Sequence, residues 1–261
     1  MTLQQSLMPY PQFTGITESA RSIGTARYDS LLIRFEKRLS AGLSVLFSAT
    51  LSDSTQRTSY QNSGFDPFGQ FILRDGGTPP WQYNLSSTYN LPFFRNNKGL
   101  TRSLLGGWQM SGIVSWFPGG IINAAGANST GIDPALPNPS YNRWFNTCTI
   151  NNNTGLRQNC ASTSEPVAWV IQRPFTLVTT PDPEWSSVRA RVPAEYNLSL
   201  FKSFAIREGF RAEFRAEAFN AFNSPRFNGP TNTATSTQFG VVTLAQANAP
   251  RSIQLSLRLS F

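Results

Sequence analysis

Histidine is absent from the 261 residues of this chain. Its absence excludes Ser-His-Asp and Cys-His catalysis and removes the commonest zinc ligand. The sequence also lacks a phosphate-cradling glycine loop, a nucleophile elbow and a metal-ligand cluster, and its paired glycines at 76–77 and 119–120 indicate turns. We therefore expect a protein that is not an enzyme and that carries neither a cofactor nor a metal.

Charged residues are scarce, and long apolar runs are missing. Asp, Glu, Lys and Arg make up 14% of the chain, against about 25% in soluble domains. The net charge of +8 is spread along the chain, without a basic helix, a zinc-finger spacing or an RNA-binding signature, so we expect no nucleic-acid partner. No run approaches the ~18 apolar residues of a membrane helix.

Cysteine occurs only twice, at Cys148 and Cys160, in a stretch rich in Gly, Asn and Thr. The spacing excludes a Cys-x-x-Cys motif and favours a small disulfide-closed loop made in an oxidising compartment, with two unrelated thiols as the alternative. Residues 1–13 do not show the basic and apolar regions of a secretory signal peptide. Either a soluble cytoplasmic protein or a chain that begins partway through a longer one would explain this.

The last segment of the chain alternates between apolar and polar residues without interruption. Ile253, Leu255, Leu257, Leu259 and Phe261 share one parity, and Ser, Gln and Arg occupy the other. Because successive side chains of a strand point to opposite faces, this pattern predicts a strand with one apolar face. The predicted strand is longer than a typical strand of a soluble protein, which has about 5–6 residues, and has the length of a strand that crosses a bilayer, which needs about 9–11. It fits both the closing strand of an outer-membrane β-barrel and an edge strand of a soluble sandwich.

Earlier segments repeat this pattern. One of them carries four charged residues that alternate with Phe and Ala: Arg211, Glu213, Arg215 and Glu217. On a strand the charges would all lie on one face and Phe and Ala on the other, whereas on a helix the charges would be distributed around the axis. With Phe and Ala toward lipid, the four charges line the interior, and the opposite register would cost about 2–4 kcal/mol for each Arg near the bilayer midplane. The predicted strands are 29–37, 42–52, 82–93, 107–117, 194–204, 209–219 and 251–261.

The aromatic spacing and the connections favour a membrane barrel. From Tyr83 to Phe93 a tilted strand would rise by about 25 Å, the height of an apolar membrane band, with rings at both interfaces. Connections alternate between short and long, as the periplasmic turns and extracellular loops of such barrels do. The short ones are 38–41, 94–106 and 205–208, and the long ones are 53–81, 118–193 and 220–250.

Six segments carry a resemblance to a known family: 34–43 (RFEKRLSAGL), 105–112 (LGGWQMSG), 143–147 (RWFNT), 197–202 (NLSLFK), 214–223 (FRAEAFNAFN) and 250–261. Together they span nearly the whole chain, which resembles the C-terminal part of TonB-dependent receptor barrels of the Oar-like type, abundant in Acidobacteria and their relatives. The combination of 214–223 with the terminal strand is the specific part, since each piece alone is weak.

The resemblance implies an all-β fold, an antiparallel transmembrane β-barrel in the outer membrane of a Gram-negative bacterium. The family barrel has about 22 strands around an N-terminal plug. Residues 28–261 would supply about seven C-terminal strands of it, with 118–193 as a long extracellular loop and 1–27 as a loop remnant. Neither a plug nor a TonB-interacting segment is found in the sequence, so we expect a partial barrel, a fragment that does not transport by itself.

The resemblance also implies partners and functional residues. The partners are outer-membrane lipid, the barrel-assembly machinery and, in a full-length receptor, the plug and TonB. Because the assembly machinery recognises a terminal aromatic strand, Leu257, Leu259 and Phe261 are expected to form the insertion signal.

Further candidates each have a structural alternative. The charged stripe from Arg211 to Glu217 could contact a plug or substrate, but we favour a self-neutralising ladder. Asn220 and Asn223 are expected to organise the strand exit through side-chain turns. Trp144, Trp169 and Trp185 could stack on carbohydrate or peptide, but we favour packing within a long loop.

Two hypotheses about the function are consistent with the sequence. One is a receptor-barrel segment for uptake of a bulky nutrient, and the other is a secreted, soluble β-sandwich that binds glycans.

Overall fold

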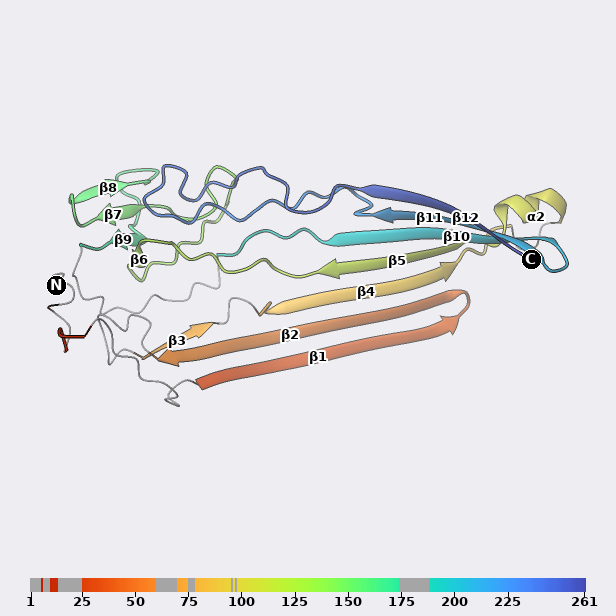
Figure 1. Ribbon diagram of the computed structural model, residues 1–261, viewed down its shortest axis with the longest axis horizontal. Coiled ribbons are helices and arrows are strands. Elements are labelled where there is room, and N and C mark those ends of the chain that lie inside the picture. Colours follow the sequence, from red (N-terminus) through yellow and green to blue (C-terminus); the bar gives the residue numbers. More distant parts are fainter. Residues whose placement is uncertain are drawn as a thin grey trace.

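The protein is built on one long antiparallel sheet, seen in a computed structural model (Figure 1). The structure describes residues 6, 10–13, 25–59, 70–74, 78–94, 96, 98–173 and 188–261. Seven long strands lie side by side in chain order: β1 (Thr25–Ser40), β2 (Leu43–Ser59), β4 (Trp81–Asn90), β5 (Gln109–Trp116), β10 (Glu195–Arg207), β11 (Phe210–Phe219) and β12 (Ser252–Ser260). A short strand, β3 (Gln70–Arg74), pairs with the last residues of β2.

The seven strands predicted from alternation are confirmed, with different ends. Pairing between β1 and β2 extends to Thr25 opposite Arg57. The backbone ladder continues there through polar residues such as Ser and Thr, which do not alternate with apolar ones and therefore give no strand signal. Strand β4 stops at Asn90 instead of residue 93, before Pro92, which has no N–H to give to the ladder. Of residues 1–27, expected as a loop remnant, the last three belong to β1, and those outside the described ranges are not placed.

The shared register gives the sheet one apolar and one polar face. Phe47, Leu85 and Val114 lie opposite one another in a row that crosses β2, β4 and β5. In the next row, Ser48 lies opposite Asn84, and side chains there point to the other face because the side-chain period of a strand is two residues. The same parity holds through β10, β11 and β12.

The two ends of the sheet differ in their connections. At the short-turn end, β1 and β2 are joined by Ala41 and Gly42, which both have a positive φ (51° and 80°), as a two-residue type I′ hairpin turn requires. Residues 208 and 209 join β10 to β11 at this same end. The connections 117–194 and 220–251 leave from the opposite end, the long-loop end (Figure 1).

Each end carries an element that was not predicted. Helix α2 (Gly99–Leu105) lies at the short-turn end, near the C-terminus of the chain (Figure 1). The long-loop end carries a small four-stranded sheet of β6 (Asn128–Ser129), β7 (Thr149–Asn151), β8 (Leu156–Gln158) and β9 (Trp169–Ile171). All of these elements are too short to show a period in the sequence. Among the described residues, no helix is long and apolar enough to span a membrane.

The apolar face of the long sheet is exposed, and the sheet is open. On β12, Leu255 and Leu257 are 66% and 67% exposed, whereas Phe145, at the long-loop end, is 1% exposed. Strands β1 and β12 each pair on one side within the described chain, so the barrel is partial. The buried apolar cluster therefore lies at the long-loop end and not on the sheet.

Two adjacent glycines lie where the chain leaving β5 meets the chain entering β10. The carbonyl oxygen of Gly120 accepts a hydrogen bond from the amide of Ala190 (3.0 Å), and that of Gly119 accepts one from the Arg189 guanidinium (3.1 Å). A Cβ atom at Gly119 would collide with the carbonyl oxygen of Ala190, whereas one at Gly120 would meet nothing within 4 Å. The close approach of the two segments thus depends on Gly119.

We expect Gly119→Ala to lower the free energy of unfolding by about 1–3 kcal/mol, because the added methyl group forces the backbone of Ala190 away. Gly120→Ala is the matched control and should change it by less than about 0.5 kcal/mol. Urea-induced unfolding, followed by tryptophan fluorescence, measures both. Equal effects of the two substitutions would contradict this packing.

Candidate functional site at the long-loop end

The loops at the long-loop end form one folded unit, here called the loop unit, made of residues 118–173, 188–193 and 220–251. Its centre is Phe145, whose ring meets Trp169 edge to face at 6.0 Å and Phe239 at 5.1 Å. Each aromatic pair of this kind contributes about 0.5–1.5 kcal/mol beyond its buried area. Since Phe239 comes from the connection between β11 and β12, the core joins two separate loops.

A disulfide and an ion pair brace this unit. Cys148 and Cys160 are joined, with an S–S distance of 2.03 Å and a sequence separation of 12. Closing a loop of this size contributes about 3 kcal/mol in the chain-entropy description. Nearby, the guanidinium of Arg143 donates to the carboxylate of Glu165, whose other oxygen accepts the amide of Ala161 at 2.5 Å.

These residues do not offer a metal site. In the described chain, Cys148, Cys160 and Glu165 are the group whose ligand atoms gather closely enough to hold an ion. Both sulfur atoms are consumed by the disulfide, and metal binding requires thiolates. The carboxylate of Glu165 is already neutralised by Arg143.

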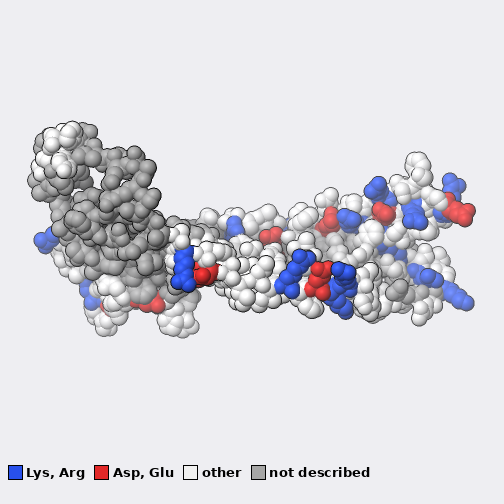
Figure 2. Space-filling view, turned by 90° about the horizontal axis from the view of Figure 1, so that it is seen from below, with Lys and Arg blue, Asp and Glu red and all other residues white. Residues whose placement is uncertain are grey.

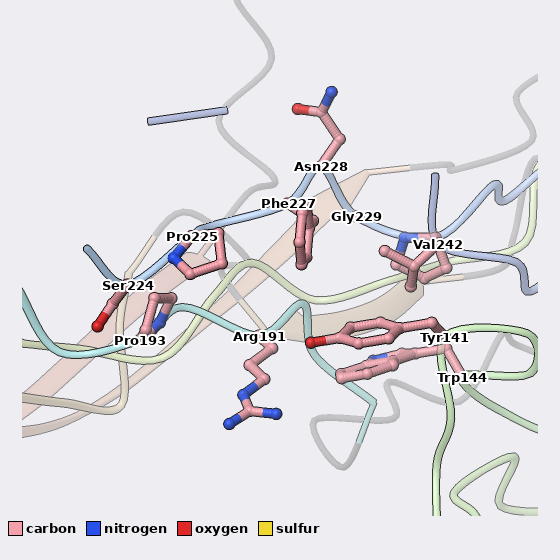
Figure 3. A pocket seen from close by; sticks show the side chains of 11 residues that line it. Tyr141, Trp144, Arg191, Pro193, Ser224, Pro225, Phe227, Asn228, Gly229 and Val242 are labelled. Atoms are coloured by element: carbon pink, nitrogen blue, oxygen red, sulfur yellow. The ribbon is translucent and has the colours of Figure 1, made fainter. Parts of the chain in front are cut away.

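Beside this core lies a cavity of about 210 Å³ with aromatic and proline walls (Figure 3). The ring of Tyr141 lies parallel to that of Trp144, with centroids 6.2 Å apart, and Phe227 meets Tyr141 edge on at 5.5 Å. Pro193 and Pro225 line the side next to the long sheet. The pocket therefore presents flat apolar surfaces to a ligand.

Hydrogen bonds hold these walls in place. The indole N–H of Trp144 donates to the carbonyl oxygen of Arg189 at 2.8 Å. The backbones of Ser140 and Arg143 bond to each other in both directions and form a tight turn around Tyr141. The amide of Val242 donates to the carbonyl oxygen of Tyr141 at 2.7 Å. Because the walls are fixed before a ligand arrives, little ordering entropy remains to be lost on binding.

The pocket contains one charged residue, Arg191, and no acidic one. Arg191 is exposed, and no hydrogen bond or ion pair joins its side chain to another residue of the described ranges. In Figure 3 its guanidinium extends away from the rings of Tyr141 and Trp144. A ring-shaped group stacked on the aromatic surfaces could direct a hydroxyl, carbonyl or carboxylate oxygen to this guanidinium.

The strand exit that leads into the pocket is fixed by two asparagines. Asn220 and Asn223 have positive φ values of 48° and 50°, a conformation that asparagine tolerates better than most residues. The side chain of Asn220 accepts the amide of Ser224 (2.9 Å) and donates to the carbonyl oxygen of Ala249 (3.1 Å). Asn223 accepts the amide of Arg251 (3.0 Å). These bonds confirm the predicted side-chain turns and set the direction of the Pro225–Phe227 wall.

The three candidate tryptophans have different positions. Trp144 is a wall of the pocket, although its indole N–H is already bonded. Trp169 is 5% exposed, belongs to the core cluster and donates its indole N–H to the carbonyl oxygen of Asn146 at 2.7 Å. Trp185 lies outside the described residues. Tyr141, Phe227 and Arg191 were not predicted, since residues in irregular loops carry no periodic signal.

The charged stripe lies on the polar face of β11, opposite the exposed apolar one. Arg215 and Glu217 form an ion pair at 3.7 Å, and the Arg215 guanidinium lies 5.6 Å from the centre of the Phe201 ring. Glu213 is in register with Arg258 of β12. Arg211, at the start of the stripe, is opposite Ser260. Figure 2, seen from the β1 side of the sheet, shows the same mixture of neighbouring acidic and basic side chains, an arrangement in which the charges compensate one another.

The proposed insertion signal lies at the edge of the sheet. Leu257 and Leu259 are in register with Phe214 and Ala212 of β11 and belong to the apolar face. Phe261 follows the end of β12 and is fully exposed. All three side chains are thus accessible at an edge of the sheet, where β12 pairs only with β11 within the described chain.

Comparison with known proteins gives one family. Residues 1–254, which include every strand except the end of β12, match a family described as an outer membrane beta barrel domain. No curated protein and no solved structure matches the chain.

Proposed function

We propose that this chain, which belongs to the family of outer-membrane β-barrel domains, contributes the ligand-receiving side of a TonB-dependent uptake receptor. Family membership places it in the outer membrane of a Gram-negative bacterium. The observation that supports the receptor role is a preformed aromatic pocket in a folded loop unit at one end of an amphipathic sheet.

The sheet has the dimensions and the faces of a transmembrane wall. Ten residues of β4, at about 3.3 Å each and tilted by about 40°, rise by roughly 25 Å along the membrane normal. The apolar face is turned toward lipid and the polar face with the stripe of β11 toward the interior. A soluble glycan-binding sandwich is not favoured, because its apolar face would be covered by a second sheet, and no such sheet packs there in the described chain.

The two ends would lie on opposite sides of the membrane. In barrels of this kind the long loops are extracellular and the short turns are periplasmic. The loop unit and its pocket would then face the medium, and the disulfide between Cys148 and Cys160 would lie in an oxidising environment.

The receptor needs parts beyond this sheet. The free edges of β1 and β12 expose backbone groups that lipid cannot satisfy, so further strands would complete the barrel and a plug would fill it. TonB would supply the energy, and the assembly machinery would recognise β12 with Leu257, Leu259 and Phe261.

The pocket suggests how a bulky nutrient is held. Its volume of about 210 Å³ is too small for a drug-sized ligand, since ligand pockets usually measure about 300–1,000 Å³. It would therefore hold one ring of a larger molecule, such as a sugar unit of an oligosaccharide, against the wall that Tyr141 and Phe227 form together.

Arginine substitutions on the two faces of β12 test the assignment of the lipid side. Leu255→Arg should lower the free energy of unfolding in phospholipid vesicles by about 2–4 kcal/mol, because it places a charge near the bilayer midplane. Gln254→Arg, the neighbouring control on the polar face, lies opposite Glu217 and should cost much less. If both changes cost the same, the two faces are not divided between lipid and interior.

Thiol labelling in whole cells tests the orientation. The native cysteines form a disulfide and give no background. A membrane-impermeant maleimide should label Thr237→Cys, in the loop unit, on intact cells. It should label Glu208→Cys, at the short-turn end, only after the cells are opened. The reverse pattern would mean that the loop unit faces the periplasm.

Uptake of radiolabelled maltooligosaccharides by cells that produce the complete receptor tests the function. We expect accumulation that is lost in a strain without TonB. Tyr141→Ala and Phe227→Ala, made singly, should each weaken the apparent affinity about tenfold, the effect of losing one aromatic contact of about 1.4 kcal/mol. Leu156→Ala, an exposed residue of the loop unit outside the pocket, is the control. Accumulation that does not depend on TonB would contradict the proposal.

A further inference from the structure

A lysine lies on the apolar face of the sheet near the short-turn end. Lys202 of β10 is in register with Phe214 and shares its face with Leu200 and Phe204. A charge on the lipid side of a barrel costs about 2–4 kcal/mol at the midplane and close to nothing at the interface. Lys202 directly follows Phe201, the last residue of β10 that pairs with β5, and so lies beside the connection between β4 and β5 at the short-turn end.

The chain covers the stem of this lysine instead of exposing it. Lys202 is 2% exposed, and its ammonium donates to the carbonyl oxygen of Gly106 at 2.6 Å. It also lies 5.3 Å from the centre of the Trp108 ring and 4.7 Å from that of Phe204, which are cation–π distances. An ammonium has three N–H donors, and the described residues supply an acceptor for one of them.

Helix α2 is held beside Lys202 and presents leucines outward. The indole N–H of Trp108 donates to the carbonyl oxygen of Leu104 at 3.1 Å and fixes the end of the helix. Leu100, Leu104 and Leu105 are 79%, 58% and 51% exposed. Leu100 and Leu104, four residues apart, lie on one side of the helix. They extend the apolar surface of the sheet to its short-turn end, as a helix lying in the plane of a membrane interface does.

Between α2 and β10 lies a cavity of about 530 Å³ with a basic rim and no acidic lining residue. Its lining includes Arg102 and Ser103 of α2 and Lys202, Ser203 and Phe204 of β10. Arg102 is exposed, and no described residue pairs with its guanidinium. The cavity thus combines two cations, the hydroxyl group of Ser103 and an apolar edge, which is the complement of a phosphodiester attached to acyl chains.

We propose that this cavity binds the phosphate of an anionic phospholipid in the leaflet at the short-turn end. Arg102 and the free N–H donors of Lys202 bond the phosphate oxygens, Ser103 donates to a remaining one, and the leucines of α2 contact the acyl chains. The site favours phosphatidylglycerol over phosphatidylethanolamine, because no acidic group lines the cavity to receive an ethanolamine ammonium. That this leaflet is the periplasmic one rests on the orientation in the proposed function.

Native mass spectrometry of the full chain, released from nanodiscs of equal parts phosphatidylglycerol and phosphatidylethanolamine, tests the site. We expect retained phosphatidylglycerol, and a loss of about tenfold in its occupancy in Arg102→Gln, since one charged hydrogen-bonding group is removed. The matched control is Arg207→Gln, an exposed arginine at the end of the same strand that does not line the cavity. Equal occupancy in the two variants, or no preference for phosphatidylglycerol in the wild type, would overturn the proposal.

Two further measurements distinguish the lipid site from a site for free phosphate and from a purely structural lysine. Lys202→Met keeps the stem of the side chain and should also lose the lipid, with unfolding in vesicles as the check that the sheet is intact. Inorganic phosphate added to the detergent-solubilised chain should not displace the lipid, and displacement by it would mean that the cavity is a site for free phosphate. If labelling at Glu208→Cys shows the reverse orientation while the lipid is retained, the proposed topology fails and the lipid site stands.

Discussion

The single register shared by the seven long strands determines the arrangement of the rest of the molecule. Each strand pairs antiparallel with the next in chain order, so one parity is apolar from β1 to β12. A shift of one residue in any pair would move every later side chain to the other face. In a bilayer such a shift would expose the charges of Arg211 and Arg215 to lipid, and the backbone groups of a broken ladder would find no water. Register and membrane position therefore stabilise each other.

A consequence is that the sheet has no apolar side chains left to support its loops. Leu255 and its neighbours are exposed on the sheet, so the loop unit must bury residues of its own. It does so around Phe145, with residues from two connections and with the disulfide between Cys148 and Cys160 as a brace. The pocket results from this packing, since Trp144 packs against the same core and Tyr141 stacks on Trp144. The proposed ligand pocket and the core that stabilises the loops are thus adjacent parts of one folded unit.

The sequence predicts the parts of this fold that repeat. Strands such as 251–261 and the polar stripe of β11 can be recognised because a two-residue period persists for a whole membrane crossing. The turn at Asn220 is predictable from residue type. Helix α2 and the walls of the pocket are not, because they depend on contacts between distant segments, such as Phe227 with Tyr141. A loop tryptophan in the sequence does not reveal whether it becomes core, as Trp169 does, or pocket wall, as Trp144 does.

The same constraint accounts for the placement of charge along the strands. Arg215 and Glu217 lie on the polar face, where an ion pair and water compensate them. Lys202 lies on the apolar face, and there the chain supplies a carbonyl oxygen and two aromatic rings around its ammonium group. A lysine needed only to fix α2 would be replaced at lower cost by an apolar residue, since α2 is also held through Trp108. The proposed lipid site accounts for this charge, because Lys202 and Arg102 line the same cavity.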